Sequence, residues 1–96
     1  DVENENSQKL EFALQQNFPN PFNPETKIIY QLSENSKVSL KIYDILGNEI
    51  VELVNKENEA GRHEVIFDAS KLPSGIYIYR INAGKFYSTK KMILVK

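Results

Sequence analysis

The feature that most constrains the fold is a two-residue period of apolar side chains, which begins near Thr26 and returns in later segments. Ile28, Tyr30 and Leu32 occupy every second position of the first such segment. Successive side chains of a strand point to opposite faces, so this period is typical of half-buried strands, whereas a helix needs a period near 3.6. No segment of the chain sustains the helical period. The chain is therefore predicted to be all-β.

Several short strands are expected, joined by turns at close intervals. Seven are placed at about residues 10–16, 26–32, 37–44, 48–54, 62–68, 75–82 and 85–95. In the fourth of these the period is imperfect, with Ile50 and either Val51 or Leu53 facing inward, and a β-bulge is expected there. This spacing of strands predicts an antiparallel β-sandwich of immunoglobulin-like type.

Turn-forming residues separate the strands. Residues 33–36 suit a hairpin, and residues 55–61 are expected to form a polar loop. Between Asp44 and Asn48, Gly47 is the residue best able to take a positive φ. These connections are short, as a sandwich of consecutive antiparallel strands requires.

A proline-rich loop precedes the first clear strand. Asn17 to Pro24 contains three prolines, which exclude a helix and remove donors from any strand ladder. Phe18 and Phe22 lie on this stiff loop and are expected to fold back as apolar plugs over one end of the core.

The N-terminal boundary of the domain is expected near Leu10. Residues 1–9 contain a single apolar residue and no periodicity, which is typical of a linker or disordered tail. Residues 10–96 are assigned to the β-sandwich domain. Because the chain begins at Asp1 rather than methionine, it is expected to be a piece of a longer protein.

Composition excludes several classes of function. Twelve Lys and Arg residues against 13 Asp and Glu give a formal charge of −1, so no field of one sign favours a nucleic-acid partner. No apolar run approaches the roughly 20 residues of a membrane-spanning helix, so direct membrane insertion is not expected. The chain has no cysteine for a disulfide or a thiolate metal site. A monomer without cofactor is expected.

Catalysis is not expected from the side chains available. The one histidine, His63, is followed by Asp68 and by Ser70 and Ser74, the residue types of a hydrolytic triad. A triad depends on geometry, however, and residues in successive turns have no reason to converge. His63 is interpreted as a partly buried strand residue, and no catalytic residue is assigned.

A calcium site is the metal alternative. Asn17, Asn20, Asn23, Asp44 and Asp68 supply oxygen atoms of the kind that calcium binds. No regular spacing unites them, and asparagine beside proline favours turns. No metal ligand is therefore assigned, and a calcium titration would decide the matter.

Aromatic side chains raise the alternative of a carbohydrate-binding module. The candidates for a sugar platform are Tyr30, Tyr43, Tyr77, Tyr79, Phe86 and Tyr87. Tyr77 and Tyr79 share one face of their strand, and Ile76, Ile78 and Arg80 share the other. Packing of the tyrosines in the sandwich core is the favoured interpretation.

Five motifs, taken together, resemble a known family. They are Asn17-Phe18-Pro19-Asn20-Pro21-Phe22-Asn23-Pro24, Ile42-Tyr43-Asp44 with Gly47, Ala60-Gly61-Arg62-His63, Leu72-Pro73-Ser74-Gly75-Ile76-Tyr77 with Tyr79-Arg80, and Thr89-Lys90-Lys91-Met92 continuing to Lys96. In this order they closely resemble the type A C-terminal sorting domain of the type IX (Por) secretion system, over about Leu14 to Lys96. The first and fourth motifs also resemble the immunoglobulin-like domain of the flagellar hook-capping protein. Phe67-Asp68-Ala69 departs from the common Trp-Asp-Gly.

The resemblance implies a sorting signal carried by a larger secreted protein of Bacteroidetes. Such a cargo reaches the periplasm, is passed across the outer membrane by the secretion machinery, and ends in the medium or on the cell surface. A sortase-like peptidase usually removes the domain, here by a cut before about Leu14. The alternative function remains a carbohydrate-binding or structural accessory module of a secreted glycoside hydrolase or adhesin.

The resemblance also implies which residues the machinery recognises. They are Gly75 and Tyr77 of the Pro-x-Gly-x-Tyr element, Gly84 and either Lys90 or Lys91 of the Gly-to-Lys element, and the terminal Lys96. The last hairpin, Gly75 to Lys96, is expected to offer a free strand edge to a receptor. Two interpretations of Lys91 and Lys96 stay open, because lysines on a terminal strand also protect an edge from aggregation.

Overall fold

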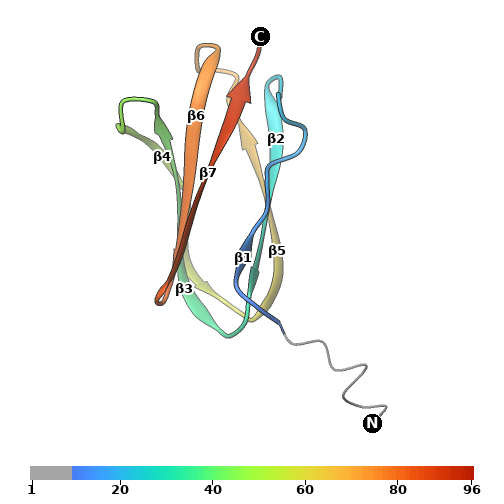
Figure 1. Cartoon of the computed structure of the whole chain (residues 1–96), viewed down its shortest axis with the longest axis vertical. Coiled ribbons are helices and arrows are strands. Elements are labelled where there is room, and N and C mark those ends of the chain that lie inside the picture. The colour runs from blue at the N-terminus through green and yellow to red at the C-terminus, as the bar shows by residue number, and fades with distance from the viewer. Residues whose placement is uncertain (1–9) are drawn as a thin grey trace.

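Seven strands form two antiparallel sheets that lie face to face (Figure 1). The structure, a computed structural model, describes residues 10–96, so the predicted linker at residues 1–9 lies outside the described part. The strands are β1 (Ala13–Leu14), β2 (Glu25–Leu32), β3 (Ser36–Asp44), β4 (Glu49–Asn58), β5 (Gly61–Asp68), β6 (Gly75–Ala83) and β7 (Phe86–Leu94). Within the described residues, no helix has the length and apolar character needed to span a membrane.

The two sheets have three and four strands. The smaller has the order β1-β2-β5 and the larger has the order β4-β3-β6-β7. Every pair of neighbouring strands is antiparallel. The predicted antiparallel sandwich of seven strands is therefore confirmed, and β7 lies at one edge of the larger sheet.

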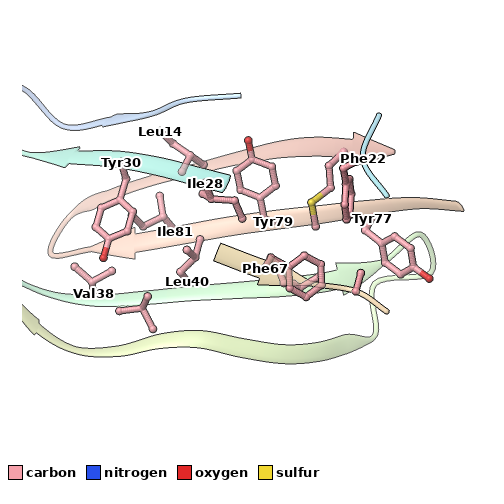
Figure 2. Close-up of a cluster of buried hydrophobic side chains, with 14 of the residues drawn as sticks. Leu14, Phe22, Ile28, Tyr30, Val38, Leu40, Phe67, Tyr77, Tyr79 and Ile81 are labelled. Carbon is pink, nitrogen blue, oxygen red and sulfur yellow. The ribbon is translucent and has the colours of Figure 1, made fainter. Parts of the chain in front are cut away.

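The core lies between the two sheets and follows the alternation that is visible in the sequence. In β2, Ile28, Tyr30 and Leu32 point inward and are at most 2% exposed. Facing side chains of the larger sheet, including Leu40 and Tyr79, meet them across the gap (Figure 2). Burial of this apolar surface, at about 25 cal/mol per Å², is the main force that holds the sheets together.

The first strand is shorter than the predicted segment 10–16, because it pairs with β2 only at Ala13 and Leu14. Beyond it, the Gln15 amide still donates to the Ile29 carbonyl at 2.9 Å. The hydroxyl of Tyr79 then binds the backbone of Gln15 and Asn17, and the backbone pairs with β2 again only at the Phe18↔Lys27 bridge. A contact with the opposite sheet, invisible in the local sequence, ends this strand.

The predicted loop at 55–61 is wrong, since β4 continues to Asn58 and only a short turn precedes β5. The polar end of β4 pairs with the start of β3, from Ser36↔Asn58 to Ser39↔Asn55. Edge strands can be polar on both faces, so this stretch carries no alternating apolar signal.

The expected bulge in β4 is confirmed, and the pairing shows two irregularities. Leu40 pairs with Val54 but Lys41 pairs with Glu52, so Leu53 is the extra residue. A second shift of the same kind leaves Ile50 unpaired. Leu53 packs against the core and Val54 is buried, whereas Ile50 is 37% exposed. The predicted inward position of Ile50 is wrong, because the bulges shift the alternation.

The two phenylalanines of the proline-rich loop differ in burial. Phe22 is 1% exposed and its ring centroid lies 6.2 Å from that of Phe67, at one end of the core (Figure 2). Phe18 is 77% exposed. The prediction of an apolar plug is right for Phe22 and wrong for Phe18, whose backbone instead bonds to Lys27 at the end of the sheet.

Candidate functional site

The last two strands, β6 and β7, form a long hairpin that carries the predicted recognition residues. They pair without interruption from Gly75↔Leu94 to Ala83↔Phe86. The turn between them contains Gly84, whose φ of 62° is in the left-handed region that glycine adopts without penalty. β6 is a central strand and β7 an edge strand of the larger sheet.

Both tyrosines of the motif in β6 point into the core, and their hydroxyls fasten other parts of the chain. The Tyr77 hydroxyl donates to the Pro73 carbonyl at 2.7 Å, which closes the turn before its own strand. The Tyr79 hydroxyl donates to the Gln15 carbonyl at 2.6 Å and accepts from the Asn17 amide at 2.7 Å. Burial raises the pKa of Tyr79 to about 12. Figure 2 shows both rings among the buried side chains.

The predicted recognition residues lie at three places on the hairpin. Gly75 and Tyr77 lie near the end where Lys96 binds the preceding turn, through its amide to Ser74 Oγ at 3.0 Å and its Nζ to the Ser70 carbonyl at 2.5 Å. Gly84 lies at the opposite end. The structure therefore does not bring these residues together into one site.

The remaining two lysines lie between these ends, on opposite faces of β7. Lys91 is exposed on the outer face, where it pairs across the sheet with Ile78. Lys90 is half-buried on the face that carries the core residue Met92. A receptor that contacts one face of the sheet would meet only one of them.

Part of the free edge of β7 is closed by residues 16–22, here called the closing segment. The Phe22 amide donates to the Ile93 carbonyl at 2.9 Å, and the Phe22 carbonyl accepts from the Val95 amide at 3.0 Å. Asn20 Oδ1 accepts from the Ile93 amide at 2.9 Å. Gln16 Nε2 donates to the Lys91 carbonyl at 2.6 Å. The expected free edge is therefore closed along its C-terminal half.

The other half of the edge is open. In an antiparallel strand, the amide and carbonyl of every second residue point to the same side, so those of Tyr87 and Thr89 point the same way as those of Ile93. Within residues 10–96, no hydrogen bond joins these outward groups to another part of the chain. Sequence reasoning missed this division, since no local pattern shows which backbone groups the proline-rich loop will bind.

His63 is separated from the other residues considered for a triad. His63 stacks on Tyr30, with ring centroids 5.3 Å apart, and its Nε2 lies 2.7 Å from the Glu59 carbonyl oxygen. Asp68 lies at the other end of β5, roughly 17 Å away at about 3.3 Å per strand residue. Asp68 Oδ1 accepts from the Ser70 amide at 2.9 Å, which is turn chemistry.

Several of the residues considered for calcium serve the fold instead. Asn17 is 2% exposed, and its Nδ2 donates to Thr26 Oγ1 at 2.9 Å. Asp44 accepts from the amides of Leu46 and Asn48, both at 2.9 Å, and the bonds from Asn48 lower the pKa of its carboxyl group. In the part of the chain that the structure describes, no three His, Cys, Asp or Glu side chains cluster as metal ligands.

Half of the six aromatic residues considered for a sugar platform are buried in the core. Tyr30, Tyr77 and Tyr79 are at most 5% exposed, as expected for core residues. Tyr87 is 65% exposed, and the Arg80 guanidinium lies over its ring at 5.3 Å from the centroid. The predicted core position is confirmed for the three buried tyrosines.

Comparison with protein families identifies the chain. The model of the family described as "Secretion system C-terminal sorting domain" matches residues 16–96. The chain belongs to this family. The match includes both the closing segment and the whole β6–β7 hairpin, and the family predicted from the five motifs is confirmed. The domain is a C-terminal sorting signal of type IX secretion.

Two solved structures share the fold of this sorting domain. Dimeric latent PorU from Porphyromonas gingivalis matches 88% of this chain with a TM-score of 0.64 and 21% identity. PorZ, a surface component of the type IX secretion system of the same organism, matches 88% with a TM-score of 0.57 and 19% identity. The matched parts are 9% of the PorU chain and 11% of the PorZ chain. Comparison with curated proteins finds no match.

Proposed function

We propose that this sorting domain takes a larger cargo protein across the outer membrane by the type IX pathway, to the cell surface or the medium. The observation that carries the proposal is the family match over nearly the whole described sandwich. The likeness of the fold to parts of PorU and PorZ supports the same assignment. The cargo reaches the outer membrane through the periplasm, and the sorting domain itself is a monomer without catalytic activity.

Removal of the domain by a sortase-like peptidase is the second part of the proposal. A cut before about Leu14 would fall outside the sandwich core, because Leu14 is 7% exposed and is among the first residues that the core contains. Gln15 and Asn17 are held by Tyr79 from the opposite sheet. The released domain would therefore keep its fold after the cut.

The β6–β7 hairpin is the proposed recognition surface. Its candidate residues are Gly75, Tyr77, Gly84, Lys90, Lys91 and Lys96. Their positions divide them by role: Tyr77 is buried and acts through the turn that it closes at Pro73, whereas Lys91 is exposed for direct contact. The open half of the β7 edge lies beside Lys91.

Truncation of the last strand cannot test recognition alone. Residues 90–96 include Met92 and Leu94, which are 0% and 1% exposed in the core. Their loss would cost several kcal/mol, since removal of one large buried side chain costs about 2–5 kcal/mol. A truncated domain would unfold and would not be exported, whether or not a receptor binds the last strand.

A pair of matched point variants gives a cleaner experiment. Lys91→Ala and Lys37→Ala each remove one exposed strand lysine from the larger sheet, on β7 and β3 respectively. Both should leave the melting temperature nearly unchanged, as surface substitutions usually do. In a bacterium with the type IX machinery, a cargo fused to the Lys91→Ala chain should stay inside the cell, whereas the Lys37→Ala fusion should be exported. Normal export of both would refute recognition of Lys91.

A further inference from the structure

Charge is divided very unevenly along this chain. Residues 69–96 contain six of the 12 Lys and Arg residues and no Asp or Glu, so all 13 acidic residues lie in residues 1–68. The acid-free part includes the whole β6–β7 hairpin. The chain as a whole has a formal charge of −1, but this edge of the sandwich is cationic.

Three of the six cations flank the open half of the β7 edge. Lys91 and Arg80 are exposed on the outer face, with Arg80 over the ring of Tyr87 at 5.3 Å. Lys90 lies on the opposite face of the same strand. The edge between them offers the unpaired amide and carbonyl groups of Tyr87 and Thr89.

These cations are not neutralised by acids of the described fold. The ion pairs found in residues 10–96 are Lys27–Glu64, Lys41–Glu49 and Arg62–Glu64. Each of them lies outside the hairpin. The positive charge around Lys90 and Lys91 is therefore available to a partner.

We propose that the open half of the β7 edge, from Tyr87 to Lys90, binds an extended acidic peptide segment of a component of the secretion machinery, which adds to the sheet as a strand. This inference rests on the proposed function and names the chemistry of its partner. An added strand would direct successive side chains to opposite faces, so neighbouring carboxylates would meet Lys90 on one face and Lys91 or Arg80 on the other. The same charges would also increase the rate at which the acidic peptide and the domain associate.

The backbone distinguishes this partner from other anions. A strand edge presents donors and acceptors in alternation, and an extended peptide satisfies both kinds. A phosphodiester or a lipid phosphate can accept from the lysines but has no N–H group to donate to the Thr89 carbonyl. Duplex DNA and anionic vesicles are therefore negative controls.

Amide chemical shifts of the 96-residue chain test the proposal directly. The probe is a capped ten-residue peptide in which pairs of glutamates alternate with threonine–valine pairs, and the control has lysine in place of glutamate. The glutamate peptide should shift the amide signals of Tyr87, Thr89 and Lys91, and the lysine peptide should not. Binding should weaken by at least tenfold between 20 mM and 500 mM salt, because screening is stronger at high salt.

Two variants separate charge from backbone pairing. Lys90→Glu combined with Lys91→Glu should abolish binding, whereas Lys56→Glu, at an exposed position of β4, should change the affinity by less than twofold. Thr89→Pro removes an outward N–H and keeps the β6 ladder, as proline does on edge strands, and should weaken binding by at least tenfold. If Thr89→Pro does not fold, the charge variants still decide the role of the lysines.

Where the acidic peptide binds, three results would still overturn the inference. The first is that the glutamate peptide shifts the amide signals of lysines outside the hairpin as much as those of the β7 edge. The second is that duplex DNA or anionic vesicles bind this edge as well as the peptide does. The third is that the peptide binds the Lys90→Glu/Lys91→Glu variant with unchanged affinity. Export assays separate the failure of this inference from the failure of the proposed function. If the Lys91→Ala fusion is retained in the cell but the acidic peptide does not bind, this inference fails and the proposed function stands. If export does not need the sorting domain, both fail.

Discussion

Phe22 and Leu94 lie side by side as parallel neighbours, although they come from opposite ends of the sandwich domain. The Phe22 amide donates to the Ile93 carbonyl at 2.9 Å, and its carbonyl accepts from the Val95 amide at 3.0 Å. The ring of Phe22 is buried beneath this bridge, at the end of the core. The proline-rich motif and the last strand, which the family match joins in one sequence pattern, therefore form one structural unit.

The burial of Phe22 leads to a stability prediction. Phe22→Ala should lower the free energy of unfolding by about 3–5 kcal/mol, the usual cost of truncating a buried phenylalanine. Urea unfolding measures this change. The matched control is Phe18→Ala, which should cost less than about 0.5 kcal/mol because Phe18 is 77% exposed. Equal effects of the two substitutions would contradict the different positions of these rings.

The closing segment predicts a pattern of hydrogen exchange along β7. The outward amides of Ile93 and Val95 are bonded to Asn20 and Phe22 and should exchange slowly. The outward amides of Tyr87 and Thr89 should exchange at least tenfold faster. Asn20→Ala should accelerate exchange at Ile93 much more than at Val95. Uniform protection along β7 would contradict the division of this edge into a closed and an open half.

The hydroxyl of Tyr79 should contribute measurably to stability. Tyr79→Phe leaves the Asn17 amide and the Gln15 carbonyl without their partner, which should cost about 1–3 kcal/mol. Tyr87→Phe should cost less than about 0.5 kcal/mol, since Tyr87 is 65% exposed. Thermal unfolding of the two variants checks the difference. A similar small loss in both would show that the Tyr79 contacts are weak.

The same hydroxyl predicts a loss of stability at high pH. The pKa of Tyr79 is raised to about 12 in the folded state, above its ordinary value of 10. The unfolded chain therefore loses this proton first, so the contribution is complete below pH 10 and is lost as the pH rises toward 12. Urea unfolding between these limits should show a shallower decline for Tyr79→Phe. Burial also raises the pKa of Tyr30, so part of the decline should remain.

Gly84 is predicted to act mainly by allowing the turn between β6 and β7, and not by contact with a receptor. Its φ of 62° is unfavourable for residues with a side chain, and Gly84→Ala should cost about 1–2 kcal/mol. Gly84→Asn should cost less, because asparagine tolerates the left-handed region better. Export that follows stability across the two variants would support a structural role. Export that is lost in both, despite the smaller destabilisation by asparagine, would support direct recognition.

The sequence was sufficient for the fold class because the strands of this domain carry a clear alternation. The inward sets of β2, β3 and β6 were all visible as every second apolar residue. The polar end of β4, residues 55–58, was missed since an edge strand that is exposed on both faces has no such signal. The strand predicted at 10–16 was too long, because the Tyr79 hydroxyl binds the backbone after Leu14.

The candidate site was less accessible to sequence reasoning. Motif matching placed the proposed recognition residues on the last hairpin, but it could not separate Lys90 from Lys91, whose side chains lie on opposite faces of β7. The closing segment was also hidden, because its bonds to Ile93 and Val95 join parts of the chain that are distant in sequence. Such contacts depend on the whole fold.

We expect this domain to be sufficient as a sorting signal. The most direct measurement fuses the 96-residue chain to the C-terminus of an unrelated periplasmic protein, in a bacterium that has the type IX machinery. The cell surface and the medium are then assayed for the fused protein. The fusion should be exported, whereas the unfused protein and a fusion that carries Phe22→Ala should both be retained. Retention of the intact fusion, while the folded domain is detected in the periplasm, would contradict this expectation.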